Sequence, residues 1–271
     1  MSGNTTLSIA VLSGKGGVGK SNLALNLAFA LNKMAAKVLL IDCDLGLANL
    51  DVLLGLAPQQ NIQNLMSASV KPGELAISLN KGLDVLPANS GILDSLDTDT
   101  LLPEIIADKL DDFARGYDFV LLDVGAGISG TALAFGAMTL ARLMVITPEP
   151  TSLTDSYALI KVLSSRYGIK DHLVLVNQVA SAKEEALAFG RLQAASSHFL
   201  DIHPTLLGSV RSDPKLIEAV RQQKPLMQAF PTTRAVADIA IIADKLVKLR
   251  NNIMPSIAGR APLTRPEIHK V

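Results

Sequence analysis

Short apolar runs alternate along the chain with longer segments of helical periodicity. The short runs lack the alternation of a strand with one face in water. They lie at residues 7–12, 37–41, 83–86, 119–122, 142–146, 173–176 and 206–210. Runs of this kind are typical of strands in a parallel sheet that is covered by helices on both faces. We therefore expect each run to form a buried strand.

The segments between these runs have the spacing of helices. They lie at residues 20–34, 101–115, 130–140, 152–167 and 183–199, and a last helix is expected over about residues 232–250. In that last segment the apolar residues gather on one face, which favours docking onto the core. The alternation predicts an α/β fold with one doubly wound, mostly parallel sheet and helices on both faces.

Residues 251–271 look different from the rest of the chain. They carry Pro255, Pro262 and Pro266, and Pro255 is expected to end any helix that would run through Ile253 and Ile257. We therefore expect one domain over residues 1–250 and a flexible tail without regular structure over residues 251–271. The scattered basic residues of this tail support membrane association only weakly, because a basic amphipathic helix is missing.

Composition narrows the class of protein. Hydrophobic residues make up 49% of the 271 residues and aromatic residues only 4%, so the core must be aliphatic. Lys+Arg and Asp+Glu balance at 25 each, which gives no basis for non-specific DNA binding. The single cysteine, Cys43, excludes an intramolecular disulfide and fits a reducing compartment. Without a signal segment or a transmembrane run, we expect a cytoplasmic protein, with the inner face of the membrane as an alternative place.

A glycine-rich loop follows the first expected strand. Residues 14–21 read Gly-Lys-Gly-Gly-Val-Gly-Lys-Ser and fit the pattern G-x-x-x-x-G-K-[ST]. The glycines let consecutive backbone N–H groups turn toward an anion, and the next helix presents its N-terminus to it. Lys20 is placed to reach the β- and γ-phosphates, and the Ser21 hydroxyl to ligate Mg²⁺. The expected nucleotide contacts are Gly14, Lys15, Gly16, Gly17, Val18, Gly19, Lys20, Ser21 and Asn22.

The same residues allow a second interpretation. Gly14, Gly16 and Gly19 also match G-x-G-x-x-G, and Asp42 follows at about the spacing of a ribose-binding acid. This pattern is typical of an NAD-dependent oxidoreductase. The Lys-Ser pair after the last glycine favours a triphosphate with Mg²⁺ instead, because a pyrophosphate does not require it.

Acidic residues end two of the expected strands. Asp42 and Asp44 lie two residues apart, so on extended backbone they point the same way, and one could hold the Mg²⁺ shell while the other orients a water. The alternative is that both are helix N-caps. Asp123 ends another apolar strand and is the candidate Walker-B ligand of Mg²⁺. Gly125 is placed to approach a γ-phosphate through its backbone N–H.

The loop around Lys15 and the two acidic segments resemble sequence motifs of one protein family. The loop Lys-Gly-Gly-Val-Gly-Lys-Ser is similar to the deviant Walker A motif of the MinD/ParA ATPases. Residues 42–51 resemble the D-x-D-x-G-x-x-N-x-D stretch of the MinD branch, and residues 123–128 its second switch. The sequence Gly-Ala-Gly-Ile-Ser at residues 125–129 is similar to the corresponding segment of the flagellar-number regulators FlhG, FleN and YlxH. The resemblance runs over about residues 7–250.

The resemblance implies a function and roles by position. The chain would bind ATP and ADP with Mg²⁺, form an ATP-dependent homodimer and hydrolyse ATP slowly. Lys15 would cross the dimer interface to the partner's phosphates, and Asp44 would position the attacking water. Asn177 matches the adenine-contacting Asn, although a turn at a strand end explains it nearly as well, and Arg211 would lie beside the base.

The implied biological role is control of flagellar number or placement, through an activating or a flagellar or division partner. A DNA-partition ATPase of the ParA branch and a MinD-type division ATPase are the alternatives, and DNA binding is disfavoured by the neutral charge. The short stretch before Leu7 leaves no room for the activator-binding segment that flagellar members often carry. The histidines, which show no motif, are expected at the surface or in caps: His172, His198, His203 and His269.

Overall fold

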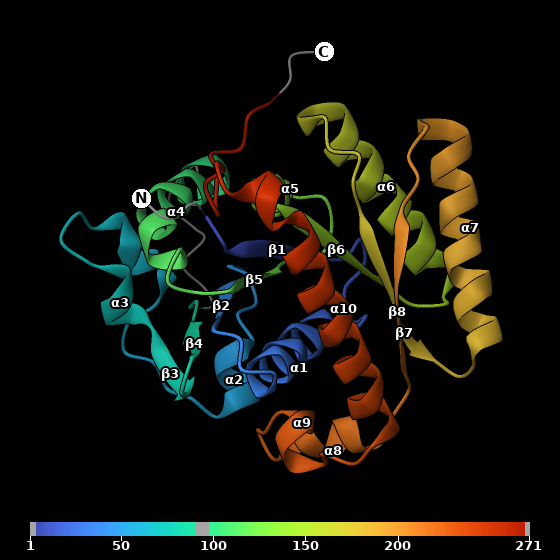
Figure 1. The fold of residues 1–271 in the computed structure, drawn as a ribbon, viewed down its shortest axis with the longest axis horizontal. Coiled ribbons are helices and arrows are strands. Elements are labelled where there is room, and N and C mark those ends of the chain that lie inside the picture. Colours follow the sequence, from blue (N-terminus) through green and yellow to red (C-terminus); the bar gives the residue numbers. More distant parts are fainter. Residues whose placement is uncertain (1–3, 90–97, 269–271) are drawn as a thin grey trace.

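The computed structural model describes residues 4–89 and 98–268 of the chain. The described strands form one eight-stranded sheet in the order β3-β4-β2-β5-β1-β6-β7-β8 (Figure 1). They are β1 (Leu7–Leu12), β2 (Val38–Cys43), β3 (Ile77–Asn80), β4 (Leu83–Leu86), β5 (Phe119–Val124), β6 (Ala141–Ile146), β7 (Leu173–Val179) and β8 (Thr205–Arg211). Every neighbouring pair is parallel except β3 with β4. The expected doubly wound, mostly parallel sheet is therefore confirmed.

The long helices cover both faces of this sheet. On one face lie α1 (Lys20–Lys33) and α10 (Arg234–Ile257), which cross the sheet side by side in Figure 1. The other face is covered by α4 (Thr98–Ala114), α5 (Gly130–Ala137), α6 (Pro150–Tyr167) and α7 (Ala182–Leu200). The strands β1, β2 and β5 are buried at every position, so their apolar runs are continuous, as the sequence pattern indicated.

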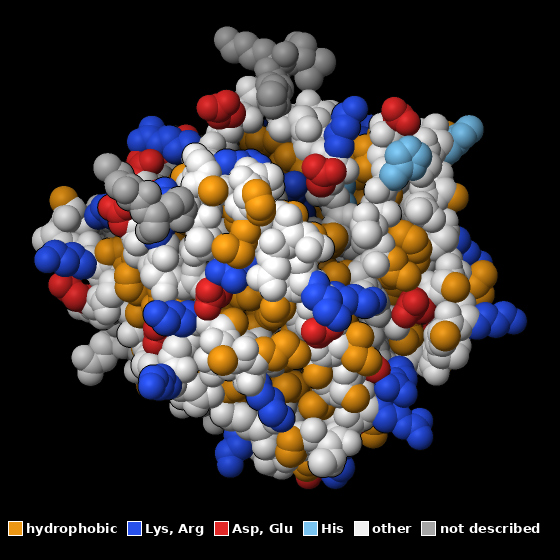
Figure 2. Space-filling model, in the orientation of Figure 1, with side chains coloured by type: hydrophobic (Ala, Val, Ile, Leu, Met, Phe, Trp, Pro, Cys, Tyr) orange, Lys and Arg blue, Asp and Glu red, His pale blue; other side chains and the backbone are white. Residues whose placement is uncertain are grey.

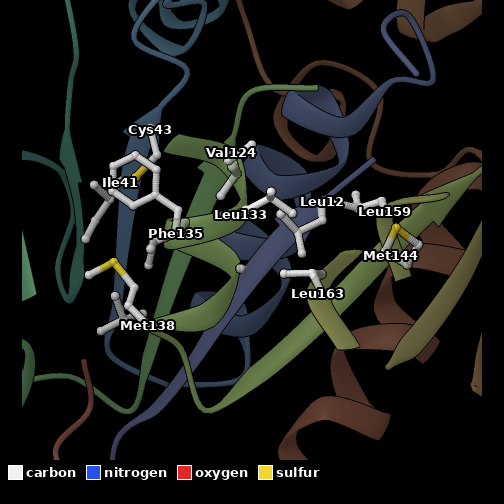
Figure 3. Packing of buried hydrophobic residues seen from close by; sticks show 14 of the residues in the cluster. Leu12, Ile41, Cys43, Val124, Leu133, Phe135, Met138, Met144, Leu159 and Leu163 are labelled. Carbon is white, nitrogen blue, oxygen red and sulfur yellow. The ribbon is translucent and has the colours of Figure 1, made fainter. Parts of the chain in front are cut away.

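Successive residues of one strand supply two separate cores. Ile9 packs with α1 and α10, whereas its neighbour Ala10 packs with the helices of the opposite face. Figure 3 shows this second core, where Leu12 of β1 lies against Leu159 and Leu163 of α6. Leucine, isoleucine, valine and alanine supply most of both cores, in agreement with the low aromatic content.

Several short elements were not predicted. They are β3, α2 (Leu50–Leu54), a 3-10 helix η1 (Ile62–Met66), α3 (Pro72–Leu75), α8 (Lys215–Arg221) and α9 (Leu226–Ala229). Each spans no more than two helical turns or a few strand residues, so its periodicity is too brief to recognise. The strand β3 is half exposed at the sheet edge, where an apolar run is not needed.

The prediction for the C-terminal segment was wrong in part. α10 continues through Pro255 to Ile257, although Pro255 was expected to end it. A proline in the last turn removes one backbone hydrogen bond, and the burial of Ile257 to 3% exposure supports the helix there. Beyond it, Leu263 is buried and forms a β-bridge with Thr139, so this segment is docked on the domain.

None of the helices in the described part of the chain combines the length and the apolar character that crossing a bilayer requires.

Candidate functional site

The glycine-rich loop joins β1 to α1 at the edge of the sheet where the parallel strands end. Gly17 has φ 80° and Gly19 has φ 83°, in the left-handed region that favours glycine. Gly14 packs directly on α6, where a Cβ atom would lie 2.2 Å from the carbonyl carbon of Asp155. These glycines therefore meet steric demands of the loop itself, besides any contact with a ligand.

A cleft of about 590 Å³ opens above this loop. Of the predicted site residues it is lined by Lys15, Gly16, Gly17, Val18, Gly19, Lys20, Ser21, Asn22, Asp44 and Gly125. The structure thus brings the loop after β1, the loop after β2 and the loop after β5 to one place. Asp42 and Asp123 do not line the cleft, because they are buried at the ends of their strands with exposures of 0% and 1%.

Lys20 is bound to one of these buried carboxylates. Its Nζ lies 2.8 Å from Asp123 Oδ1, and the side chains are 6% and 1% exposed. Among the described residues, no group donates a hydrogen bond to the other oxygen, Asp123 Oδ2, which is fully buried. A buried carboxylate oxygen without a donor is suited to a cation or to a water in its shell.

Asp42 lies opposite Asp123 in the register of β2 and β5. Its carboxylate accepts backbone N–H groups from Asp44 at 3.0 Å and from Asn49 and Leu50 at 3.2 Å. The N-cap residue of α2 is Asn49, so Asp42 is not the N-cap considered as the alternative, although it accepts the N–H of Leu50, the first residue of this helix. Burial and then the charge of Asp123 raise the pKa of Asp42 to about 7, while the three N–H donors lower it.

Asp44 occupies a different position from Asp42. It is partly exposed in the cleft, and its Oδ1 accepts the backbone N–H of Leu47 at 3.1 Å. A Cβ atom on Gly125 would lie 3.3 Å from the same oxygen, so the loops after β2 and β5 meet here. Gly127 N in turn donates to Ser13 O at 2.9 Å, which ties the loop after β5 to the glycine-rich loop.

Lys15 points to the rim of the cleft. Its Nζ donates to Glu149 Oε2 at 2.6 Å and to Thr151 Oγ1 at 3.0 Å, at the start of α6. The side chain keeps 37% of its surface exposed. The amino group of Lys15 is therefore held by the same chain at the outer side of the loop, whereas that of Lys20 lies at the inner side against Asp123.

Asn177 and Arg211 line a neighbouring cleft of about 220 Å³, which shares Gly19 and Asn22 with the first. Asn177 Nδ2 donates to Val18 O at 2.8 Å, and the side chain is 6% exposed. Arg211 binds Asp238 on α10, with Nε–Oδ2 at 2.8 Å and Nη2–Oδ1 at 2.6 Å. Both side chains thus brace the walls of this cleft, and the guanidinium of Arg211 is engaged there.

The residues present fit Mg²⁺, the cofactor that the loop motif implies. Ser21 offers a hydroxyl in the cleft, and Asp123 offers the buried oxygen without a donor. Hydroxyl and carboxylate oxygens, completed by phosphate oxygens and water, are the donors that Mg²⁺ prefers. Asp42 was expected to ligate Mg²⁺ as well, but both of its carboxylate oxygens already accept backbone N–H groups.

Sequence reasoning missed Glu149 and Thr151 as the partners of Lys15, and Asp238 as that of Arg211. None of them belongs to a recognisable motif, and Lys15 and Glu149 are separated by 134 residues in the chain. Glu149 directly precedes α6, and Thr151 is its second residue. Pro150 between them is a common residue in the first turn of a helix. That pattern marks a helix start but says nothing about a lysine partner.

Comparisons with known proteins agree with this geometry. A family model described as an AAA domain matches residues 6–186. The antiactivator FleN of Pseudomonas aeruginosa is 34% identical over 88% of this chain and 85% of its own length. The flagellum site-determining protein YlxH of Helicobacter pylori is 36% identical over 90% of this chain and 83% of its own length.

The fold is shared with solved structures as well. A MinC:MinD cell division protein complex from Aquifex aeolicus contains a chain that superposes with a TM-score of 0.71 at 27% identity, covering 89% of this chain and 96% of that one. These matches decide the interpretation of the glycine pattern in favour of the phosphate loop over the dinucleotide motif. The chain therefore belongs to the MinD/ParA family of P-loop ATPases with a deviant Walker A motif, and its relatives include FleN and YlxH.

Proposed function

We propose that this chain is an ATP-operated switch that binds ATP with Mg²⁺, dimerises in that state and hydrolyses ATP slowly. The observation that carries the proposal is the division of labour between two lysines of one loop. Lys20 lies buried against Asp123, where a phosphate would compete with this carboxylate for the charge of the lysine, whereas Lys15 lies at the rim with its amino group directed out of the loop. A lysine at the rim is placed to reach a nucleotide bound by a second copy.

The rim of the cleft has the character of an interface. Leu47 in the loop after β2 is 71% exposed, and Ile128 in the loop after β5 is 53% exposed. Both loops border the cleft through their neighbours Asp44 and Gly125. Exposed apolar side chains beside a polar site favour burial against another protein surface. A second copy that meets this rim would bury them and bring its own Lys15 to the shared site.

The composition of the cleft supports slow hydrolysis. The described residues that line it include Lys15 and Lys20 but no arginine. Charge that develops on the transferred phosphoryl group would therefore rest on lysines, backbone N–H groups and Mg²⁺. When bound, Mg²⁺ supplies electrostatic stabilisation of the phosphate charge. Asp44 is partly exposed in the cleft and is therefore placed to orient a water, whereas Asp42 is buried.

For the biological role, we propose control of flagellar number or placement with a protein partner. FleN is named an antiactivator and YlxH a flagellum site-determining protein, and both resemble this chain over most of its length. On the face shown in Figure 2, lysine and arginine side chains are dispersed and interspersed with acidic ones, which is unlike the basic stripe of a DNA-binding face. This favours the flagellar role over DNA partition.

Light scattering after size exclusion tests the switch. The full chain is run with Mg²⁺ and ATP, ADP or NAD. We expect a dimer with ATP and a monomer with ADP or NAD. We also expect calorimetry to show that ADP binds and that NAD does not. A chain that stays monomeric with ATP, or binds NAD and not ATP, would refute the proposal. The flagellar role is tested by counting flagella on cells that lack the gene.

A further inference from the structure

A group of basic residues lies at the sheet edge opposite the phosphate loop, where β6 and β7 begin. A cleft of about 490 Å³ opens there between the start of β6, the loop after α6 and the C-terminal segment. Its charged lining residues are Arg142, Lys170, Asp171, Arg260, Arg265 and Glu267. Since the strands run parallel from this edge, the cleft is separated from the nucleotide cleft by the length of the sheet.

Arg142 is the unusual residue of this cleft. Its Nη1 donates to Thr139 O at 3.0 Å, and its Nε and Nη2 donate to Asp171 O at 3.3 and 3.2 Å. Both acceptors of these three hydrogen bonds are neutral backbone carbonyls. Burial lowers the pKa of Arg142 and the neighbouring Arg260 lowers it further, whereas Asp171 raises it. The charge of this partly buried guanidinium is thus held by dipoles, without a carboxylate in contact.

Two further cationic side chains of this cleft, those of Lys170 and Arg260, also lack a carboxylate in contact among the described residues. Within the described residues, none of the ion pairs includes Arg142, Lys170 or Arg260. Lys170 and Arg260 are exposed at the mouth of the cleft. Arg265 differs from them, because it forms a bidentate pair with Asp108. Three positive side chains that line one polar cleft therefore lack a contacting counter-charge.

We propose that this cleft binds a phosphate-type anion, held by Arg142, Arg260 and Lys170. A guanidinium has five N–H donors, so the three bonds of Arg142 to carbonyls leave two donors for a ligand. The planar fork of arginine matches the oxygens of a phosphate, and a lysine adds a point charge. The phosphate can belong to a free phosphomonoester or to a lipid headgroup, since the recognising chemistry is the same.

The test follows the backbone amides of the full chain labelled with ¹⁵N, with inorganic phosphate as the probe and chloride adjusted to constant ionic strength. The titration is made with Mg-ADP present, to occupy the phosphate loop, and again without nucleotide. We expect saturable shifts of the Gly168, Ile169 and Lys170 signals in both titrations. Signals of residues 14–19 form a separate set, so failure of nucleotide binding would not obscure this site.

Two variants make the assignment specific. Arg260→Gln should weaken phosphate binding at this cleft by about tenfold, the loss expected for one charge-assisted hydrogen bond. Arg191→Gln, at an exposed arginine of α7, is the matched control and should leave the affinity unchanged. Arg142→Gln should also weaken binding, and its amide spectrum shows whether the fold is retained.

Vesicles separate the two sources of phosphate. Flotation with phosphatidylcholine vesicles is compared with flotation after addition of phosphatidic acid. Binding that requires phosphatidic acid and is lost in Arg260→Gln, without shifts from inorganic phosphate, assigns the ligand to a lipid headgroup. Shifts from inorganic phosphate that Arg260→Gln weakens assign it to a free phosphate. A chain in which neither probe gives an Arg260-dependent response overturns the proposal.

Discussion

Lys20 Nζ lies 2.8 Å from Asp123 Oδ1, and both side chains are almost completely removed from solvent. The lysine comes from the start of α1 and the carboxylate from the end of β5, 103 residues apart in the chain. Each group is the counter-charge that makes the other tolerable in the interior. The pair therefore holds the two halves of the candidate nucleotide site in register, besides any contact with phosphates or Mg²⁺.

Breaking this pair from one side should be costly. Asp123→Ala leaves the Lys20 charge buried without a partner, which lowers the free energy of unfolding by about 3–5 kcal/mol. Urea denaturation measures the loss. The double variant Lys20→Met with Asp123→Leu should recover most of it, because no charge then remains buried. Asp244→Ala, which breaks the exposed pair with Lys248, is the control and should cost less than about 1 kcal/mol. Equal losses for the two alanine variants would show that burial of the pair is energetically irrelevant.

Lys15→Ala and Asp44→Ala should fail in opposite ways. Lys15 lies at the rim, so its removal should leave a chain that binds nucleotide but stays monomeric with ATP. Asp44 bears on the water and not on the phosphates, so its removal should slow hydrolysis about 100-fold or more, the range for a group that assists proton transfer. The ATP-bound dimer then accumulates. Light scattering and phosphate release measure the two effects.

The controls for these variants are Lys33→Ala and Asp112→Ala, which remove an exposed lysine of α1 and an exposed aspartate of α4. Both should behave as the parent chain. Monomers for both test variants, or dimers for both, would rule out the action of Lys15 on a second copy. Loss of nucleotide binding in Lys15→Ala would assign this lysine to its own loop instead.

Asn177→Ala should weaken binding of Mg-ADP by about tenfold, since the variant removes the bond to Val18 O that braces the loop. Calorimetry with ADP and with pyrophosphate separates two roles. A loop brace affects both ligands, whereas a contact with the base affects ADP alone. Asn251→Ala on the exposed side of α10 is the control. Unchanged affinity for both ligands would leave Asn177 without a part in the site.

The stability of the fold should depend on His172 in mildly acidic solution. This histidine was expected at the surface or in a cap, but it directly precedes β7 and is 3% exposed. Burial, and second the charge of Arg142, lower its pKa to about 4 from the usual 6.5. Its contribution to stability is thus present above pH 6.5, where both states are neutral. It is lost as the pH falls toward 4, because only the unfolded chain takes up the proton.

The loss between these values is about 3 kcal/mol for this group. Urea denaturation at pH 7 and pH 4.5 should therefore show a smaller decline for His172→Gln than for the parent chain. His198→Gln, an exposed histidine of α7, should keep the parent's decline. An identical decline in His172→Gln would mean that the buried ring is protonated without cost.

Leu263 tests whether the C-terminal segment belongs to the fold. The side chain is 2% exposed and its segment pairs with Thr139, so Leu263→Ala should lower the free energy of unfolding by about 2–5 kcal/mol. Ile268→Ala removes a side chain that is 61% exposed and should change it by less than about 0.5 kcal/mol. Similar small effects of both variants would return this segment to the flexible tail that the prolines indicated.

The sequence predicted those parts of the molecule whose signals are local and long. The bounds of β1 and β4 were predicted to the residue, because apolar runs of buried strands start and end sharply. The glycine-rich loop was recognisable because Gly14, Gly17 and Gly19 meet steric needs at fixed positions and Lys20 meets an electrostatic one. By contrast, β3 is too short and too exposed to stand out, and α10 passes Pro255 because tertiary contacts outweigh one lost hydrogen bond.

The arrangement of the site depended on contacts that no local pattern encodes. Asp42 and Asp44 were expected to point the same way, one toward the Mg²⁺ shell and the other toward a water, but the chain turns sharply after Cys43 and folds the backbone N–H groups of the next loop onto Asp42. Lys15 was assigned to a second copy, and its resting place against Glu149 could not be seen in the sequence. Such contacts appear only once the strands have been ordered in the sheet.

Gly14 has a consequence for the evolution of the chain. With a Cβ atom at this position 2.2–2.4 Å from the backbone of Asp155 and Ser156, the clash cannot be relieved by a change of rotamer. A substitution there would have to move α6 as a body, and with it Glu149 and Thr151, where Lys15 rests. As long as α6 keeps its position, only glycine is therefore compatible with the backbone at position 14. The contact thus fixes the distance between the phosphate loop and α6, and substitutions on the exposed side of α6 leave that distance unchanged.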